Sequence, residues 1–275
     1  MDFSDADFDR LSTFLQSKLG IKLPESKRTM LSGRLTKRLR ILGLTSFAAY
    51  CDFLFSAEGQ KTELIPLMDT VTTNKTDFFR EPAHFAYLTG TVLPSLISRG
   101  EKHCRVWSAG CSTGEEPYTL AMVLSDYRHS NSARGFSFEI TASDISTKVL
   151  EIAKRAIYSE DKVHPIAMDM KKRYLLKGKG PNLGMVRIVP EQRALVRFGR
   201  LNFMHDDFRM PVRQQVIFCR NVLIYFDKET QEMVINRLCQ YLVPDGYLFL
   251  GHSESIMGYK VPLIQEASTI FRRLA

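Results

Sequence analysis

The sequence lacks most of the features that mark a secreted, membrane-spanning or disulfide-bonded chain. Its five cysteines are scattered over 275 residues and no two of them form a C-x-x-C pair, so we expect free thiols rather than a disulfide framework or a structural zinc site. No apolar stretch approaches the roughly 20 residues with which a helix crosses a bilayer. The first ten residues, MDFSDADFDR, are acidic and do not resemble a signal peptide. These absences predict a protein of the reducing cytoplasm.

Acidic residues are also missing from one long interval of this basic sequence. The net charge is +8, and no Asp or Glu occurs from Ser26 to Cys51, an interval that holds six Lys or Arg. A second interval, from Lys171 to Arg200, holds nine Lys or Arg and the single acid Glu191. Such intervals form either solvated faces or surfaces for an acidic partner, and the total charge does not distinguish the two.

Hydrophobic spacing divides the chain into a helical part and an α/β part. Residues 3–70 carry apolar side chains at helical spacing and predict a small all-α domain with one basic side. From about residue 91, apolar runs alternate with helical segments, which predicts a mainly parallel sheet covered on both faces. The predicted strands are residues 104–109, 138–144, 196–203, 216–219, 247–251 and 270–274, and the helices between them are 116–128, 146–157 and 228–242. Residues 171–196 break this rhythm and predict a small β insertion.

The segment SAGCSTGEEPYTL, residues 108–120, places glycines and acids together after the first predicted strand. Gly110 and Gly114 let the backbone approach a ligand closely, at the edge of the sheet where α/β folds bind ligands. The spacing matches neither the dinucleotide fingerprint nor the nucleoside triphosphate loop. Glu115 and Glu116 would repel a pyrophosphate and attract a cation, so the loop favours S-adenosylmethionine, which has an ammonium, a sulfonium and no phosphate. The alternative is that both glutamates only stabilise a helix N-terminus.

Two further polar residues follow predicted strands. Asp144 ends the second strand, where a carboxylate can accept both ribose hydroxyls of an adenosine; its alternative role is to cap the helix that begins near Ser146. Asn202 ends the third strand and can pair with an adenine edge, although a surface turn amide is the alternative. With the glycine loop, these residues favour a ribonucleoside ligand that lacks phosphate.

Four segments together carry a family resemblance: VTTNKTDFFREPAHF (71–85), VWSAGCSTGEEPYTLAM (106–122), ASDIS (142–146) and FCRNVLIYFD (218–227). Over nearly its whole length the chain resembles the bacterial chemotaxis receptor methyltransferases. The resemblance implies an S-adenosylmethionine-dependent protein-glutamate O-methyltransferase, which forms glutamate methyl esters on methyl-accepting chemotaxis receptors in sensory adaptation and leaves S-adenosylhomocysteine. It also implies a Rossmann-like methyltransferase sheet with a small all-α N-terminal domain and an inserted small antiparallel β subdomain.

The domain limits expected from pattern and resemblance are residues 1–70 for the helical domain and 71–90 for a linker that contributes to the cofactor site. Residues 91–275 form the expected S-adenosylmethionine-binding catalytic domain, with the β insertion at about 171–198.

The resemblance also assigns site residues. Glu115 would meet the methionine ammonium, with Glu116 as the alternative, and Asp144 would hold the ribose. Asn202 and Phe203 would border the adenine. The expected cofactor-binding residues are Asn74, Thr76, Arg80, Gly110, Glu115, Asp144, Asn202, Phe203, Arg220 and Asn221.

The expected catalytic residues are Arg80, Arg220 and Tyr225. One of the two arginines would orient the incoming glutamate and Tyr225 would hydrogen-bond near the reaction centre, although a core tyrosine is the alternative. A glutamate, with an ordinary pKa of about 4.3, is already ionised near neutral pH, so we expect no general base. The six histidines show no metal-ligand spacing, so we expect no metal site.

The resemblance implies partners as well. The acidic helical bundle of a receptor would dock on Arg34, Lys37 and Arg38, and a receptor C-terminal peptide would add a strand to the β insertion. A cytoplasmic enzyme recruited to membrane receptor arrays is expected, with no membrane insertion and no nucleic-acid partner. The alternatives are methylation of another protein or of nucleic acid, a nicotinamide oxidoreductase, which Glu115 and Glu116 disfavour, and a non-catalytic module that binds the cofactor.

Overall fold

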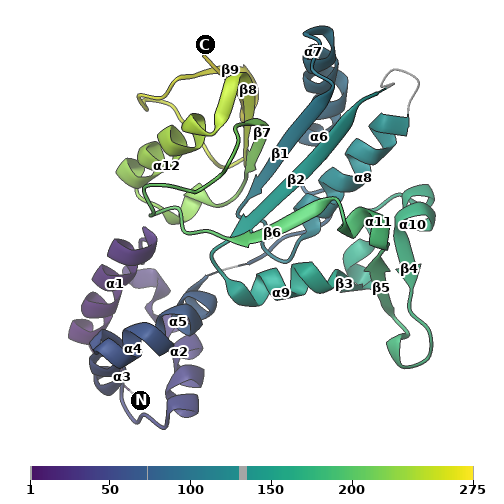
Figure 1. The fold of residues 1–275 in the computed structure, drawn as a ribbon. Helices are drawn as coiled ribbons and strands as arrows, with labels where there is room; N and C mark the ends of the chain where they lie inside the picture. Colours follow the sequence, from purple (N-terminus) through teal and green to yellow (C-terminus); the bar gives the residue numbers. More distant parts are fainter. Residues whose placement is uncertain (1, 73, 130–134, 275) are drawn as a thin grey trace.

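The computed structural model describes residues 2–72, 74–129 and 135–274 of the chain, and it begins with a bundle of helices (Figure 1). Ser4 caps the start of the first helix by accepting a hydrogen bond from the Asp7 N–H, and Gly20 ends it at a φ of 71°. The leucines of the first two long helices repeat at helical spacing and are buried together. The elements of the bundle are α1 (Asp5–Leu19), η1 (Glu25–Lys27), α2 (Arg28–Leu42), α3 (Phe47–Phe55), α4 (Ala57–Thr62) and α5 (Leu64–Val71).

Two basic side chains of α2 form hydrogen bonds to other residues of the helical domain. Arg34 donates from Nη1 to the backbone carbonyls of residues 70–72, at the end of α5. Arg38 donates from Nε and Nη2 to the two carboxylate oxygens of Glu63, which is 1% exposed and also accepts a hydrogen bond from Tyr50. Lys37, between the two arginines, is exposed. The basic interval therefore supplies internal contacts as well as a charged surface.

The second part of the chain is built on a seven-stranded sheet in the order β6-β2-β1-β7-β8-β10-β9. Its strands are β1 (His103–Ala109), β2 (Ser137–Asp144), β6 (Val196–Arg200), β7 (Gln214–Cys219), β8 (Leu242–Leu250), β9 (Leu263–Ala267) and β10 (Ile270–Arg273). The pairs from β6 to β8 are parallel, and β10 pairs antiparallel with β8 and β9. The chain moves from β1 outward through β2 to β6 and then returns to β7, so the strand order reverses between β1 and β7. Ligands of open α/β sheets bind at such a reversal.

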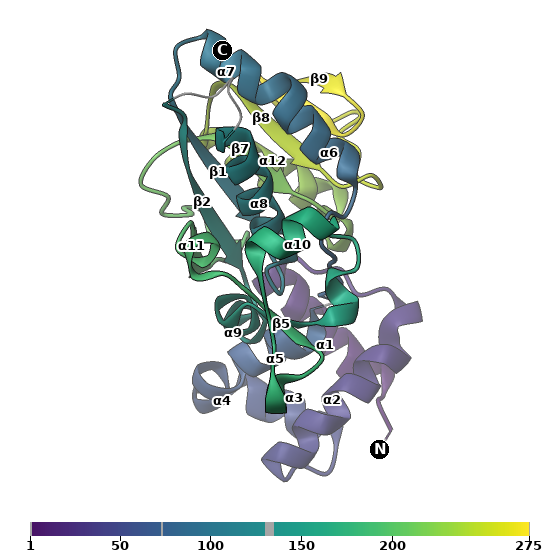
Figure 2. The same ribbon diagram turned by 90° about the vertical axis from the view of Figure 1, so that its right-hand side faces the viewer.

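Helices cover both faces of this sheet (Figures 1 and 2). Alternate residues of one strand point to opposite faces, so that Val106 joins the core under α8 and α7, whereas Trp107 joins the core under α12. The helices of this part are α6 (Pro82–Tyr87), η2 (Leu88–Val92), α7 (Leu93–Ser98), α8 (Glu115–His129), α9 (Thr147–Arg155), η6 (Leu223–Tyr225) and α12 (Lys228–Gln240). The expected fold class is confirmed.

The inserted subdomain is a three-stranded antiparallel sheet in the order β3-β5-β4. It comprises β3 (Ile157–Ser159), η4 (Glu160–Val163), α10 (Met168–Tyr174), β4 (Leu175–Lys177), η5 (Gly180–Asn182), β5 (Met185–Ile188) and α11 (Pro190–Arg193). The strand β3 lies before the interval in which the sequence predicts the insertion, because the helix expected over 146–157 ends at Arg155 and Ala156 adopts a left-handed φ of 55°.

Two further elements differ from the sequence-based prediction. Part of the expected linker, residues 71–90, is helical: Pro82 begins α6, where a proline costs no helical hydrogen bond. The strand β9 was not predicted, because an edge strand with exposed residues has no apolar alternation.

Candidate active site

A cavity of about 390 Å³ lies between the helical domain and the carboxyl ends of β1, β2 and β7. The α/β part and the segment before it contribute lining residues that include Asn74, Thr76, Arg80, Gly110, Ser112, Glu116, Asp144, Asn202, Phe203, Arg220, Asn221 and Tyr225. The segment that joins α1 to α2 contributes Ile21, Lys22, Leu23 and Lys27 to the opposite wall. The cavity therefore brings together every expected site residue except Glu115.

The turn after β1 is shaped by its glycines. Gly110 has a φ of 88°, and a Cβ atom at this position would lie 2.4 Å from Cγ2 of Val222. At Gly114, where φ is 98°, a Cβ atom would lie 2.9 Å from the Tyr158 hydroxyl and from the Ala153 Cβ. Both positions therefore require glycine, for backbone conformation and for space. The turn can approach a ligand closely.

The two glutamates of the loop lie in different surroundings. Glu116 lines the cavity, accepts a hydrogen bond from the Ser108 hydroxyl at 2.7 Å, and lies 3.5 Å from Nε of Arg220. Glu115 is 1% exposed, accepts a hydrogen bond from the Thr113 hydroxyl at 2.6 Å, and lies 3.8 Å from Nζ of Lys162. Burial raises the pKa of both carboxyls. Glu116, the alternative that the sequence left open, is the one that faces the cavity.

Asp144 and Asn202 line the cavity while they also make internal hydrogen bonds. The Asp144 carboxylate accepts from the N–H groups of Ser112 at 2.8 Å and Ser146 at 3.0 Å. Burial raises the pKa of Asp144, and these backbone bonds oppose the rise. Asn202 donates from Nδ2 to the Lys18 carbonyl at 2.9 Å, a contact with the helical domain. Both side chains therefore line the cavity and are held by hydrogen bonds within the protein, while the N-cap of α9 is Ser146 and not Asp144.

Arg220 lies at the end of β7 among acids and aromatic rings. Its Nε is 3.5 Å from both Glu81 and Glu116, and its Nη2 donates to the Arg80 carbonyl. The guanidinium carbon lies 5.4 Å from the centre of the Phe85 ring, within cation–π range. Its Nη1 is buried and has no hydrogen-bond partner among the described residues. A buried charged donor without a partner is costly, so this atom suits a bound carboxylate.

The linker residues that line the cavity also make hydrogen bonds within the protein. The Asn74 carbonyl accepts a hydrogen bond from the Ser112 hydroxyl at 3.0 Å, and the Thr76 carbonyl accepts one from Lys162 at 2.9 Å. Arg80 is partly exposed and donates from Nη1 to the Lys75 carbonyl at 3.1 Å. The linker is therefore tied to the glycine loop and to the subdomain that contains Lys162.

The segment after β7 depends on one carboxylate that the sequence analysis missed. Glu254 is 6% exposed and accepts hydrogen bonds from four backbone N–H groups, those of Gly251, Asn221, Val222 and Leu223, at 2.5–2.9 Å. Asn221 has a left-handed φ of 58°, which the bonded carboxylate helps to hold. The sequence GHSES shows an acid after a predicted strand, but nothing in it indicates four backbone partners.

The helical domain also holds this segment. The N–H of Lys22 donates to the carbonyl of Tyr225 at 2.9 Å, and Ile21 forms an antiparallel bridge with Phe226. The wall contributed by the segment between α1 and α2 is therefore hydrogen-bonded to the residues that follow β7.

A strand reversal between β1 and β7, a glycine turn that admits close approach and a cavity with acidic side chains fit a methyltransferase that uses S-adenosylmethionine. The chain belongs to the CheR methyltransferase family: the model of its SAM-binding domain matches residues 74–271, and that of its all-alpha domain matches residues 6–72. The expected family, enzyme class and cofactor are confirmed.

Curated relatives agree with this assignment. The chain is 38% identical to a chemotaxis protein methyltransferase of Borreliella burgdorferi, over 92% of this chain and 89% of the relative. It is 41% identical to that of Escherichia coli, over 92% and 85%, and 38% identical to chemotaxis protein methyltransferase 2 of Pseudomonas aeruginosa, over 93% and 88%. Solved structures overlap weakly: the magnesium protoporphyrin IX methyltransferase of Synechocystis, 14% identical over 82% of this chain and 94% of its own, has a TM-score of 0.37. The family models and the curated relatives therefore carry the assignment. Within the described residues, no helix has the length and apolar character needed to cross a membrane.

Proposed function

We propose that this methyltransferase forms methyl esters on glutamate side chains of methyl-accepting chemotaxis receptors. The observation that carries the proposal is the pairing of charges in the cavity. Glu116 and Asp144 suit the cationic, unphosphorylated cofactor, whereas Nη1 of Arg220, which has no hydrogen-bond partner among the described residues, suits a carboxylate. The names of the curated relatives, chemotaxis protein methyltransferases, support receptors as the substrate. The enzyme would act in the cytoplasm, recruited to membrane receptor arrays.

The residues that hold the cofactor are assigned by the groups they offer. Glu116 binds the methionine ammonium and Asp144 accepts from the ribose hydroxyls. Asn202 and Phe203 border the adenine, and Gly110 lets the backbone lie against the ligand. The remaining expected contacts are Asn74, Thr76, Arg80, Arg220 and Asn221. Glu115 does not contact the ligand. It stabilises the glycine loop by accepting a hydrogen bond from the Thr113 hydroxyl.

Bound S-adenosylmethionine supplies a methyl group that is activated by a positively charged sulfur. The protein aligns the glutamate oxygen with that methyl group and removes water from the carboxylate. Arg220 and Arg80 orient the incoming carboxylate, and Tyr225, which lines the same cavity, hydrogen-bonds near the reacting oxygen. Because the carboxylate is already ionised, no side chain needs to accept a proton.

The receptor would dock on the exposed basic residues of α2. Lys37 and Arg40 are exposed. In contrast, Arg34 is hydrogen-bonded to the end of α5, and Arg38 is hydrogen-bonded to Glu63. The sequence suggested a docking surface of Arg34, Lys37 and Arg38. The contacts of the two arginines replace it with a surface of Lys37 and Arg40. An acidic helix would be attracted there, more strongly at low salt.

A receptor C-terminal peptide would pair with an edge of the small sheet. Both β3 and β4 are edge strands of it, and β4 carries Leu176, which is 50% exposed. An extended peptide can add a strand to such an edge. The domain limits proposed above, 1–70, 71–90 and 91–275, leave this edge in the catalytic domain.

The test uses the purified full chain, tritiated S-adenosylmethionine and membranes that contain chemotaxis receptors. We expect label in receptor protein that is released as volatile methanol by alkali, because methyl esters hydrolyse in base. Membranes with receptors whose methylation-site glutamates are replaced by alanine are the control. Label that resists alkali, or that enters nucleic acid or another protein instead, would contradict the proposal and favour the corresponding alternative.

A further inference from the structure

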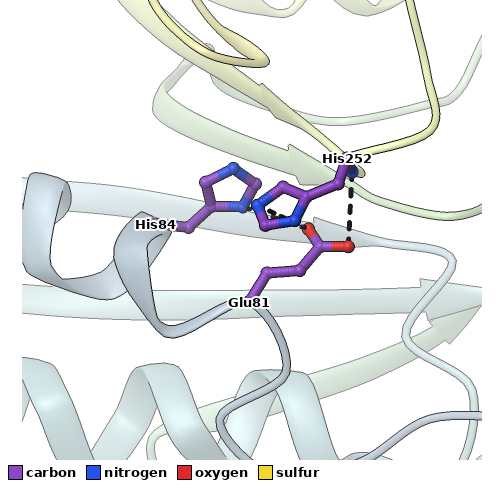
Figure 3. A group of neighbouring side chains, drawn as sticks. All are labelled: Glu81, His84 and His252. Atoms are coloured by element: carbon purple, nitrogen blue, oxygen red, sulfur yellow. Dashed lines mark hydrogen bonds and ion pairs between the residues drawn. The ribbon is translucent and has the colours of Figure 1, made fainter.

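We propose that Glu81, His84 and His252 form a binding site for a divalent transition-metal ion of the zinc type. Glu81 and His84 lie at the start of α6, and His252 follows β8, so that residues far apart in the sequence converge beside the cavity (Figure 3). One ligand atom from each side chain lies within 4.8 Å of the others. Nothing in the spacing of the histidines along the chain indicates this cluster.

The distances suit a tetrahedral ion. Oε2 of Glu81 is 3.5 Å from Nδ1 of His84 and 3.9 Å from Nε2 of His252. Ligand atoms about 2.0–2.2 Å from a tetrahedral zinc ion are separated by roughly 3.3–3.6 Å. The first distance already falls in this range. The His252 side chain is 56% exposed and its ligand atom lies within 4.8 Å of the other two, so it is the side chain that would move inward when an ion binds.

Two of the three ligand atoms have no hydrogen-bond partner in the described part of the chain. Oε2 of Glu81 and Nδ1 of His84 are both buried, and neither makes a hydrogen bond to a described residue. The His84 side chain is 2% exposed and points toward Glu81 (Figure 3). Buried polar atoms are nearly always partnered, and an exception calls for a bound ion or water. An ion between these atoms would satisfy both.

The second ring nitrogen of His84 and the second carboxylate oxygen of Glu81 each contact another residue, as the outer groups of established metal sites do. Nε2 of His84 lies 3.0 Å from the hydroxyl of Thr269. If His84 donates there, its Nδ1 carries the lone pair that a metal requires. Oε1 of Glu81 accepts from the N–H of His252 at 3.3 Å and from Nδ2 of Asn221 at 3.4 Å. Oε2, which has an ion pair with Arg220 but no hydrogen bond to a described residue, is then the oxygen that can bind a metal ion.

One nearby arginine shares the proposed ligand atom. Arg220 Nε forms an ion pair with Oε2 of Glu81 at 3.5 Å, without a hydrogen bond, and lies at the same 3.5 Å distance from Glu116, which can take up its charge when an ion binds. Arg80 Nε is 4.0 Å from Oε1 of Glu81 rather than from Oε2. Both remain as outer groups that orient the carboxylate.

The ligand set selects the class of metal. Two imidazoles and one carboxylate suit zinc, copper or nickel, whereas magnesium and calcium take oxygen ligands almost exclusively. The site leaves a fourth position on the exposed side of His252 for water. The ion would join the beginning of α6 to the segment after β8 and would hold Glu81 beside Arg220.

The test is direct titration of the chelator-treated full chain with Zn²⁺ alone, by calorimetry and by competition with a chromogenic chelator. We expect one saturable ion per chain. His252→Ala, a change at an exposed side chain, should weaken binding at least tenfold, and Thr269→Val should weaken it about tenfold through loss of the outer hydrogen bond. Thr269→Ser should restore binding. His164→Ala, which alters an exposed histidine elsewhere, is the matched control and should bind like the unaltered chain.

Co²⁺ provides a spectroscopic readout that does not depend on activity. Binding by nitrogen and oxygen ligands should give visible bands without the near-ultraviolet charge-transfer band of cobalt–thiolate bonds. This distinction matters because the chain has buried free thiols. A thiolate band, the absence of saturable binding, or equal affinity in the unaltered chain and His252→Ala would each overturn the proposal. None of these results depends on the identity of the methyl acceptor.

Discussion

The Oε1 atom of Glu254 accepts a hydrogen bond from the backbone N–H of Leu223 at 2.8 Å, across 31 positions of the chain. The same carboxylate binds the N–H groups of Asn221, Val222 and Gly251. Gly251 lies close enough that a Cβ atom there would be 2.5 Å from the Asn221 side chain. A single buried acid thus shapes the segment that supplies the cavity with its residues after β7.

We expect Glu254→Gln to lower both the stability and the turnover of the enzyme. A glutamine has one acceptor oxygen, and its NH₂ group would face backbone N–H donors, which leaves buried groups unpaired at a cost of about 1–3 kcal/mol each. Thermal unfolding should occur at a lower temperature, and kcat should fall more than the cofactor KM rises. Glu151→Gln, at an exposed acid, is the control. Unaltered kcat in Glu254→Gln would show that the four hydrogen bonds do not position the site.

Glu116→Gln should weaken binding of S-adenosylhomocysteine far more than Glu115→Gln. Only Glu116 lines the cavity, and the loss of a charge-assisted hydrogen bond to the ammonium is expected to cost about 1.5–3 kcal/mol, or roughly 10- to 150-fold in affinity. Calorimetry with both variants measures this difference. If Glu115→Gln weakened binding more than Glu116→Gln, Glu115 would be the residue that binds the ammonium.

Cofactor affinity should also fall as the pH is lowered. Burial raises the pKa of Glu116 in the unliganded protein, and a bound ammonium favours the ionised form, so binding releases a proton between the two pKa values. Affinity therefore decreases with falling pH, by at most about tenfold per pH unit, starting above the ordinary range of a glutamate. Titrations in buffers of different ionisation enthalpy measure the released proton. A slope that persists in Glu116→Gln would assign the proton to another group.

Tyr225→Phe should reduce kcat by about tenfold and leave the KM for S-adenosylmethionine nearly unchanged. Loss of one hydrogen bond near the reacting oxygen is worth about 1.4 kcal/mol, or one factor of ten. Tyr259→Phe removes a hydroxyl that binds Gln231 outside the cavity and serves as the control. Full turnover of Tyr225→Phe would remove this hydroxyl from the mechanism.

Reversal of charge at two neighbouring positions of α2 should have different consequences. Lys37→Glu should raise the KM for receptors, most clearly at low salt, without a change in thermal stability, because Lys37 is exposed. Arg38→Glu should destabilise the helical domain by about 3–5 kcal/mol, because the buried Glu63 would lose its partner. Unfolding curves and receptor titrations separate the two effects. A stable Arg38→Glu variant with weak receptor binding would restore Arg38 to the docking surface.

The sequence alone predicted the layered fold because periodicity is a local property. Apolar residues at helical spacing marked the helical domain, and alternating runs and helices marked the parallel sheet. The glycine loop could be predicted for the same reason, because Gly110 and Gly114 lie within one short segment of the chain. The unphosphorylated cofactor followed from the sign of charge of Glu115 and Glu116.

The sequence did not predict which of the two adjacent glutamates faces the cavity. It also did not predict what each basic residue of α2 contacts. Neighbouring residues on a helix point in different directions, so the choice of Glu116 depends on how α8 packs. The partner of Arg38 is Glu63, which lies in the turn between α4 and α5.

Contacts between side chains far apart in the chain were the features that the sequence predicted least. Glu254 and the segment after β7 meet because β7 and β8 are adjacent in the sheet. His84 and His252 meet because α6 packs where β8 ends. Local pattern determines which elements form, whereas the distance between side chains far apart in the chain depends on strand order and helix packing, and these exist only once the whole chain has folded.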